Sequence, residues 1–412
     1  MSASRAVVEN GEKSLATAVP PYLPFARPSI TWREKRAVLE VLDSGWLTTG
    51  ERTKQFEEQF RERVGSGHAI AVSSATAALH LALEALGVGP GDEVIVPTWT
   101  FAASAEVVAL LGARPVLVDV DPVTLNVTPD GALAAVTPRT KAVVAVHFAG
   151  RPVEIERLVG ALRPRNIAVV EDAAHAFPSV VGGSGGRYVG TFGRAGAFSF
   201  YATKTITTGE GGMLVTDDDA IAERARVMSL HGISSDAWKR YSAGGSWFYE
   251  IEDAGYKYNL TDLAAALGLV QLDRADELLA ARRTIAAGYT RGFSASSAAD
   301  LLDLPVDAPD GSHAWHLYVV RLRLDRLGIS RNEAIERLRG AGIGVSVHFI
   351  PLHLHPYYRR QWGTRPEDCP VATREYERVI SLPIWPGMSE GDVDRVVGAL
   401  AHALDRARLV TR

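Results

Sequence analysis

The chain of 412 residues contains a single cysteine, Cys369. One cysteine excludes an internal disulfide and a cysteine-rich metal site, and it fits a reducing compartment. No apolar run is long enough to cross a membrane, and the first 20 residues lack the apolar core of a signal peptide. We therefore expect a soluble cytoplasmic protein in which residues 1–22 form a mobile leader.

The chain also lacks a strong excess of either charge, since 44 basic residues stand against 48 acidic ones. This balance gives no reason to expect nucleic acid or an anionic membrane as a partner. Hydrophobic residues make up 47% of the sequence, which is ordinary for a globular enzyme. The length is sufficient for two domains, each with its own core.

Short apolar strands alternate with helices through the first half of the chain. The expected strands are 69–72, 93–96, 116–120, 142–146, 168–170, 197–200 and 212–216. Helices are expected between several of them, at 75–86 and 103–111. This alternation is typical of an α/β protein whose mainly parallel sheet is covered by helices on both faces.

The second half of the chain has a different pattern. Residues 234–258 are rich in aromatic residues and glycine, and we interpret them as a lid or a contact with another subunit. One helix is predicted over 260–279. The rest of the chain predicts a smaller α+β domain, from strands at 314–322 and 345–350 and helices at 331–339 and 392–404. The expected domains are therefore a large one over 23–280 and a small C-terminal one over 281–412.

A lysine, Lys204, stands alone between an expected strand and the glycine-rich turn at 209–212. Burying a lysine is costly unless it has a partner or a lowered pKa. One use for such a residue is as an amine that forms a Schiff base with an aldehyde cofactor. The alternative is a surface lysine beside a hairpin turn, and this run alone does not decide between them.

Two polar residues upstream favour the cofactor. Two carboxylates, Glu171 and Asp172, follow the apolar strand 167–170 directly, at the end of the strand where open α/β sheets bind ligands. Asp172 is the candidate. The Asp172 carboxylate could pair with the protonated ring nitrogen of pyridoxal phosphate, so that the ring continues to withdraw electrons from the reacting carbon. His175 could pack on the ring or bond its oxygen. Taken singly, Asp172 would be a helix cap and His175 a core histidine, but together with Lys204 they favour a cofactor site.

Other candidates are weaker by themselves. The turn at 73–78 joins a strand to a helix start that could bind a phosphate, although it lacks a P-loop signature and could be an ordinary N-cap. Aromatic residues at 97–101 could stack on a planar ring or simply pack. Lys257 and Asn259 could bind an oxyanion. The histidines 348, 353 and 355 suggest a metal cluster, but no Cys or Glu completes it, so no metal is expected.

The order and spacing of these motifs resemble a known family. From residue 23 to the final helix, the chain resembles the pyridoxal-phosphate-dependent sugar-nucleotide aminotransferases of the aspartate-aminotransferase fold (fold type I). Among them it looks most like the UDP-4-amino-4-deoxy-L-arabinose–oxoglutarate aminotransferases. The resemblance rests on segments 44–50, 74–76, 171–175, 199–212, 255–262, 313–317 and 347–349.

The resemblance implies a role for each matching residue. Lys204 would form the Schiff base with the cofactor and then shuttle the proton, and Asp172 would pair with the ring nitrogen. His175 would lie close to the ring and Phe101 would stack on it. The phosphate would be held by the backbone of Ala75 and Thr76 and by the hydroxyl of Ser199.

The chain departs from many relatives at three positions. Lys257 stands where an asparagine reaches the cofactor phosphate of the neighbouring subunit, and Asn259 stands where an arginine is usual. A lysine can still bind a phosphate. Tyr201 replaces a histidine, so it joins His348 as a candidate for substrate contact. Relatives that have become dehydratases lack the lysine. Lys204 is present in this chain, so a dehydratase activity is not expected.

The implied reaction is transfer of an amino group from glutamate, which becomes 2-oxoglutarate, to C4 of a nucleoside-diphosphate 4-keto sugar. The acceptor would be a UDP-4-keto-pentose or a dTDP-4-keto-6-deoxyhexose, in an active site shared by a homodimer. Two alternatives remain open at this stage. One is a 3-keto sugar nucleotide as the acceptor, and the other is a non-catalytic regulator that only binds the cofactor or the sugar.

Overall fold

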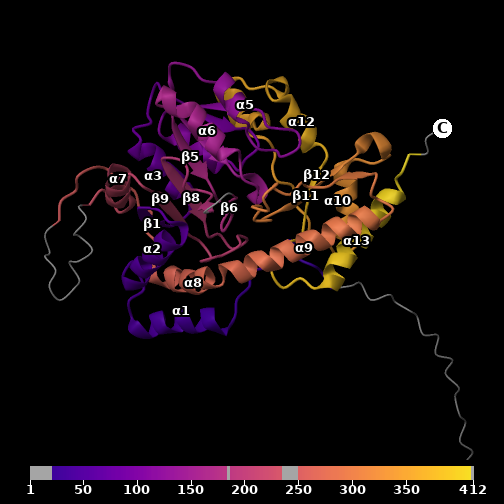
Figure 1. Ribbon diagram of the computed structural model, residues 1–412, viewed down its shortest axis with the longest axis horizontal. Helices are drawn as coiled ribbons and strands as arrows, with labels where there is room; N and C mark the ends of the chain where they lie inside the picture. The colour runs from indigo at the N-terminus through magenta and orange to yellow at the C-terminus, as the bar shows by residue number, and fades with distance from the viewer. Residues whose placement is uncertain (1–20, 183–185, 234–248, 410–412) are drawn as a thin grey trace, which may run out of the picture.

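The computed structural model describes residues 21–182, 186–233 and 249–409 (Figure 1). Most of the predicted leader and most of the aromatic-rich segment 234–258 lie outside the described residues. Within the described residues, no helix combines the length and the apolar character that crossing a membrane requires.

A seven-stranded sheet forms the centre of the larger part of the molecule. Its order is β1-β9-β8-β5-β4-β2-β3, and within this sheet β9 alone runs antiparallel to its neighbours. The strands are β1 (His68–Val72), β2 (Glu93–Pro97), β3 (Arg114–Val118), β4 (Thr140–Val146), β5 (Ala168–Asp172), β8 (Ala195–Ser199) and β9 (Gly212–Thr216). The α/β class with a mainly parallel mixed sheet is therefore confirmed.

Helices cover both faces of this sheet, because alternate side chains of each strand point to opposite faces. On β1, Ile70 and Val72 join one apolar core, whereas Ala69 and Ala71 join another. The first core includes residues of α3 (Ala75–Ala85), α4 (Ala103–Leu110) and α7 (Asp219–Ser229). Further cores on the sheet include residues of α2 (Glu51–Val64), α5 (Pro129–Ala134), α6 (Ile155–Leu162) and α8 (Asp262–Asp273).

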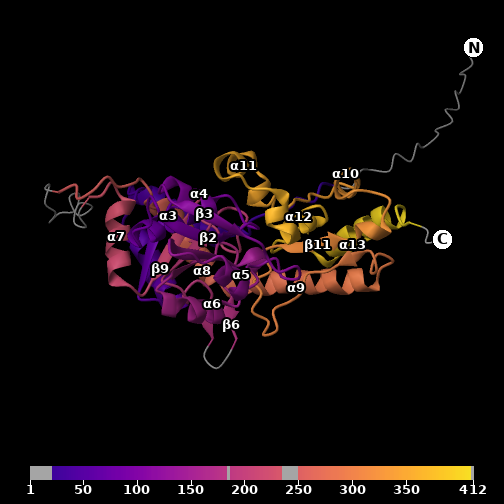
Figure 2. The same cartoon turned by 90° about the horizontal axis from the view of Figure 1, so that it is seen from above.

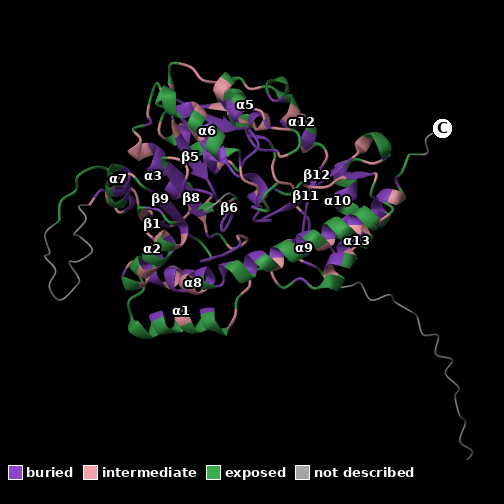
Figure 3. Cartoon of the chain, in the orientation of Figure 1, coloured by how far each residue is buried: buried purple, intermediate pink, exposed green. Residues whose placement is uncertain are grey.

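Helix α1 (Trp32–Ser44) lies outside this layer, packed against α8. Figure 3 shows that the outward face of α1 is exposed, whereas α8, which lies above α1 in this view, has few exposed residues. A short two-stranded ribbon of β6 (Val180–Val181) and β7 (Arg187–Tyr188) extends from the sheet region.

The C-terminal part has its own core around a three-stranded antiparallel sheet. The strands are β10 (Leu302–Asp303), β11 (Tyr318–Leu322) and β12 (Val379–Leu382). Helices α9 (Ala275–Ala295), α10 (Arg331–Gly340) and α13 (Glu390–Asp405) contribute residues to this core, and Leu23 joins it from the other end of the chain. Two short helices, α11 (Pro356–Trp362) and α12 (Pro370–Tyr376), lie between α10 and β12. Helix α9 runs from the larger part into the smaller one (Figure 2). The predicted boundary at 280 falls inside α9, so the two-domain division stays a prediction.

Two of the predicted elements are wrong. The single helix over 260–279 is two helices, because Arg274 leaves the helical conformation (φ −96°, ψ 4°) between α8 and α9. The run 345–350 forms no strand, and within it Ser346 alone pairs, with Ser381 of β12. Apolar composition in a short run does not by itself distinguish a strand from a segment that lines a cavity.

Candidate active site

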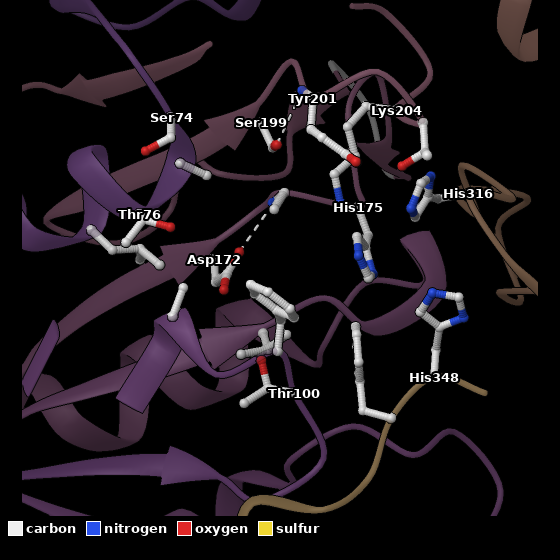
Figure 4. Close-up of a pocket in the computed structure, with 18 of the residues that line it drawn as sticks. Ser74, Thr76, Thr100, Asp172, His175, Ser199, Tyr201, Lys204, His316 and His348 are labelled. Atoms are coloured by element: carbon white, nitrogen blue, oxygen red, sulfur yellow. Dashed lines mark hydrogen bonds between the residues drawn. The ribbon is translucent and has the colours of Figure 1, made fainter. Parts of the chain in front are cut away.

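A cavity of about 490 Å³ lies at the carboxyl ends of the parallel strands of the large sheet (Figure 4). Its lining includes the residues that end β4, β5 and β8, together with His316, His348 and Phe349 from the C-terminal part. It brings together most of the predicted site residues, namely Ala75, Thr76, Phe101, Asp172, His175, Ser199, Tyr201, Lys204 and His348. Lys257 and Asn259 are not among its lining residues.

Lys204 lies in the turn between β8 and β9 and faces this cavity (Figure 4). Burial lowers the pKa of its amine from 10.5 to about 8, although the negative charge of Asp172 opposes this change. The positive charge of Arg282 lowers the pKa further. With a pKa near 8, roughly a tenth of the amine is uncharged at pH 7, which is enough for it to act as a nucleophile or a base.

The carboxylate of Asp172 is buried and held in a fixed orientation. Ser104 Oγ donates to Asp172 Oδ2 at 2.7 Å, and the Ala174 amide donates to Oδ1 at 3.2 Å. Ser104 is itself in contact with Thr100 Oγ1 at 2.7 Å. A fixed carboxylate at this place can accept a hydrogen bond from a protonated ring nitrogen.

Three imidazoles surround the lysine. The rings of His175 and His316 lie 4.3 Å apart, and His348 Nδ1 is 2.9 Å from Ser381 Oγ. Burial lowers the pKa of His175 and His316 well below the usual value and that of His348 to about 4, so all three are uncharged at neutral pH. The Nδ1 atoms of His175 and His316 are buried without a hydrogen-bond partner among the described residues.

The N-terminus of α3 forms another wall of the cavity. Ser74 caps the helix by accepting from the Ala77 amide at 3.1 Å. The first amides of a helix have no partner within it, so those of Ala75 and Thr76 are suited to bind an anion. β9 approaches this turn so closely that a Cβ on Gly212 would lie 2.4 Å from the Ser74 carbonyl carbon. Glycine is therefore required for the turn and the strand to pack at this distance.

Aromatic side chains line the same cavity. Phe101 is 63% exposed and Tyr201 46% exposed, although both are large hydrophobic residues. Phe349 lies 6.1 Å from the Phe101 ring and is stacked on His175 at 5.9 Å. Exposed aromatic faces beside a cavity can bind a planar or sugar ring.

The structure places Lys257 and Asn259 next to each other instead of in the cavity. Lys257 Nζ donates to Asn259 Oδ1, and Asn259 Nδ2 donates to Thr49 Oγ1 at 2.7 Å. Asn259 also pairs with Val72 at the end of β1, next to the turn that leads into α3. Their predicted role in cofactor binding stays a prediction.

The histidines considered for a metal bind separate partners. His353 Nδ1 is 2.7 Å from Thr98 Oγ1, whereas His348 bonds Ser381 and His355 Nε2 is 3.3 Å from the Ile350 carbonyl oxygen. No group of three or more His, Cys, Asp or Glu side chains in the described residues is arranged to hold a metal ion.

Sequence reasoning missed several residues of the cavity. Thr100 lines the cavity, and it contacts Ser104, which lies behind the lining and donates to Asp172. Both are small polar residues, and only the fold shows this connection. Glu210 also lines the cavity. His316 lies in segment 313–317, which is part of the resemblance but was given no role. The spacing of two histidines three residues apart, His313 and His316, was the signal in the sequence that could have identified it.

Taken together, these residues fit pyridoxal phosphate. The cavity offers an amine with a lowered pKa, an oriented carboxylate, a helix N-terminus for the phosphate and two buried imidazole nitrogens without partners. Such a combination of a reactive lysine and an acidic partner for a ring nitrogen is what this cofactor requires.

Comparisons with known proteins agree with this assignment. The family model of the DegT/DnrJ/EryC1/StrS aminotransferases matches residues 28–401. The spore coat polysaccharide biosynthesis protein SpsC of Bacillus subtilis is 48% identical over 380 residues, which cover 92% of this chain and 96% of the relative.

Solved structures show the same fold. The aminotransferase TlmJ from Streptoalloteichus hindustanus has a TM-score of 0.84 at 37% identity, covering 93% of this chain and 99% of TlmJ. The putative sugar aminotransferase Spr1654 from Streptococcus pneumoniae, in its PMP-form, has a TM-score of 0.85 at 34% identity, with the same coverage of 93% and 99%. Spr1654 is also known in a PLP-form. The expected fold type I, the pyridoxal phosphate cofactor and the expectation of an enzyme are thereby confirmed. The chain is a pyridoxal-phosphate-dependent sugar aminotransferase and belongs to the DegT/DnrJ/EryC1/StrS aminotransferase family.

Proposed function

We propose that this enzyme transfers an amino group from glutamate to the C4 keto carbon of a nucleoside-diphosphate sugar. The observation that carries the proposal is the lowered pKa of Lys204 in a cavity that also holds the oriented carboxylate of Asp172. Few other arrangements need an uncharged lysine beside a fixed carboxylate at the ends of parallel strands.

Pyridoxal phosphate, when bound, supplies an aldehyde that accepts the amino group and a conjugated ring that withdraws electrons from the reacting carbon. The chain supplies the remaining functions. The uncharged Nζ of Lys204 takes the proton from the carbon that carries the amino group and returns it later in the reaction. Asp172, anchored by Ser104, would hold the ring nitrogen in its protonated form.

The remaining residues of the cavity would position the cofactor. The amides of Ala75 and Thr76 and the hydroxyl of Ser199 would bind its phosphate. His175 is uncharged at neutral pH and can bond the ring oxygen without adding charge. Phe101 would cover one face of the ring, since its side chain lines the cavity and is exposed.

The acceptor would lie against Tyr201 and His348, which line the cavity with hydrogen-bonding groups. A UDP-4-keto-pentose or a dTDP-4-keto-6-deoxyhexose is the proposed acceptor, and the 3-keto isomer is the second candidate. The name of SpsC, which refers to polysaccharide biosynthesis, supports a sugar acceptor in this chain.

We further propose a homodimer in the cytoplasm, with Lys257 and Asn259 reaching the partner's cofactor phosphate. Exposed apolar side chains around α1 support a covered surface in the assembly. These are Trp32, Leu39, Leu42, Trp46 and Leu47. The single cysteine, which is buried and unpaired, supports a reducing compartment.

The absorbance spectrum of the purified protein tests the reaction and the acceptor. We expect a visible band that disappears when glutamate is added and returns when one keto sugar from a panel of UDP-, dTDP- and GDP-linked 4-keto and 3-keto sugars is added. Lys204→Ala should lose turnover with every acceptor. Full turnover of Lys204→Ala would show that the assigned lysine is wrong, and return of the band with a 3-keto sugar alone would replace the C4 acceptor.

The dimer is tested by measuring mass in solution and mixing inactive variants. Because each proposed active site uses residues of both subunits, Lys257→Ala mixed with Lys204→Ala should regain part of the activity that each lacks alone. Absence of any regain in a mixed dimer would contradict the shared site.

A further inference from the structure

Arg282, in helix α9, is a buried cation without an acidic partner. Its side chain is one of the largest fully buried side chains in the described residues, with an exposed fraction of 2%. Among the described residues no carboxylate lies within the 4.0 Å that defines an ion pair with it, and its Nε has no hydrogen-bond partner. An unpaired buried charge is costly. Burial lowers the pKa of Arg282 to about 10, so the guanidinium is still charged at neutral pH.

Backbone carbonyl groups satisfy most of its donors. Nη1 donates to the carbonyl oxygens of Ile384 at 2.9 Å, His316 at 3.2 Å and Trp315 at 3.4 Å. Nη2 donates to the Thr203 carbonyl oxygen at 3.3 Å. One guanidinium therefore connects the C-terminal part, including the segment that carries His316, to the residue directly before Lys204.

We propose that Arg282 is a positioning residue for Lys204. Its guanidinium holds the turn that carries the amine through the Thr203 carbonyl group, and its unneutralised charge favours loss of the proton from the amine. This inference rests on the proposed role of Lys204. Arg282 does not line the cavity, so it acts through Lys204 and not on the substrate. A hydrophobic residue of similar length could fill the space, but it could neither bind four carbonyl oxygens nor supply a charge.

The groups that face Lys204 explain why this charge matters. The three nearby histidines are uncharged at neutral pH, so they contribute little. Asp172 favours the charged amine, whereas burial and Arg282 favour the uncharged amine. Glu210 also lines the cavity but is exposed to solvent, which screens its charge. Arg282 thus offsets part of the effect of the carboxylate that the cofactor needs.

The test uses four variants and the cofactor itself. Arg282→Met removes the charge, and Arg282→Lys keeps a charge but loses the fork of donors. Arg283→Met is the matched control, because Arg283 is the next residue of the same helix, is exposed and donates to the Gly311 carbonyl oxygen at 2.8 Å. Lys204→Ala identifies the reacting amine. Each protein is freed of cofactor and mixed with pyridoxal phosphate, and the rate at which the visible band forms is measured as a function of pH.

We expect Arg282→Met to move the midpoint of this rate profile to higher pH. Band formation at neutral pH should slow by roughly three- to tenfold, because a rise of about 0.5 to 1 in the pKa of the amine lowers its uncharged fraction by that factor. Arg283→Met should match the wild type. Arg282→Lys should have a midpoint closer to that of the wild type than Arg282→Met has.

An unshifted midpoint in Arg282→Met, or an equal shift in Arg282→Lys and Arg282→Met, would overturn the proposal. If Arg282→Met does not fold, Arg282→Gln replaces it with the same expectation, because glutamine removes the charge but can still donate to a carbonyl oxygen. Band formation by Lys204→Ala would instead contradict the proposed function, so the two failures are distinguishable.

Discussion

Replacing Glu34 by glutamine should destabilise the protein at neutral pH and reduce its sensitivity to acid. Glu34 is 1% exposed in α1. Its Oε1 accepts from Arg274 Nη1 at 2.5 Å and from Gln271 Nε2 at 2.8 Å, and its Oε2 accepts from the Thr31 amide at 2.7 Å. Burial alone would raise the pKa of Glu34, but the hydrogen bonds from Thr31 and Arg274 lower it from 4.5 to about 2.

The sign and the size of the effect follow from this difference in pKa. Because the folded pKa lies below the unfolded one, the stabilisation is complete above pH 4.5 and is lost as the pH falls from 4.5 to about 2. At about 1.4 kcal/mol for each pKa unit, the ionised carboxylate contributes about 3 kcal/mol, order of magnitude. Glutamine keeps the shape of the side chain but cannot supply this charge to the buried guanidinium of Arg274.

Denaturant unfolding at a series of pH values measures this contribution. The difference in free energy of unfolding between the wild type and Glu34→Gln should be about 3 kcal/mol at neutral pH and should shrink below pH 4.5. Glu40→Gln is the control, since Glu40 lies on the same helix with a side chain 45% exposed, paired with Arg36 and Arg52. Its effect should stay below about 1 kcal/mol. A gap between the wild type and Glu34→Gln that does not depend on pH would refute the reasoning.

Three further substitutions have defined outcomes. Ser104→Ala should weaken pyridoxal phosphate binding and turnover by about tenfold or more. The reason is that the Asp172 carboxylate loses a hydrogen bond of 2.7 Å, which is worth about 1.5 to 3 kcal/mol. Cofactor titration and steady-state kinetics measure the two effects. Asp262→Ala should cost about 3 to 5 kcal/mol in denaturant unfolding, because its carboxylate accepts four hydrogen bonds from the start of α2. Gly212→Ala should reduce both thermal stability and cofactor affinity, because the new Cβ would lie 2.4 Å from the Ser74 carbonyl carbon.

Matched variants separate these effects from general damage. Thr100→Val should cost less activity than Ser104→Ala, because it leaves the bond from Ser104 to the carboxylate intact. Asp273→Asn, at the exposed end of α8, should be nearly neutral in unfolding. Gly160→Ala in α6 meets no atom within 4 Å and should be tolerated. The reverse order in any of these pairs would contradict the corresponding prediction.

The regular elements were predictable where the pattern was local. The strands of the large sheet are short apolar runs bounded by polar residues, and each of them was found within a few residues of its expected position. α10 and α13 were likewise found near the expected ranges. The prediction of one helix over 260–279 was wrong because Arg274 interrupts it. The guanidinium of Arg274 at this interruption binds the carboxylate of Glu34, which lies 240 residues earlier in the chain. No local pattern contains such a contact.

The sequence by itself determined that this protein has a mainly parallel sheet and that a lysine, an aspartate and a helix start stand at the ends of its strands, because residue periodicity and strand ends are local properties. The sequence also determined the family, because the order and spacing of short motifs can be compared with those of relatives without knowing which residues are in contact. Only the tertiary structure decided which distant residues complete the cavity. His316 lines the cavity with Lys204, and Arg282 binds the carbonyl group of the preceding residue, Thr203, because α9 and the segment before β11 pack against the turn that carries the lysine. The pKa of Lys204 is therefore a property of that packing, since burial and the balance of two charges from different parts of the chain set it.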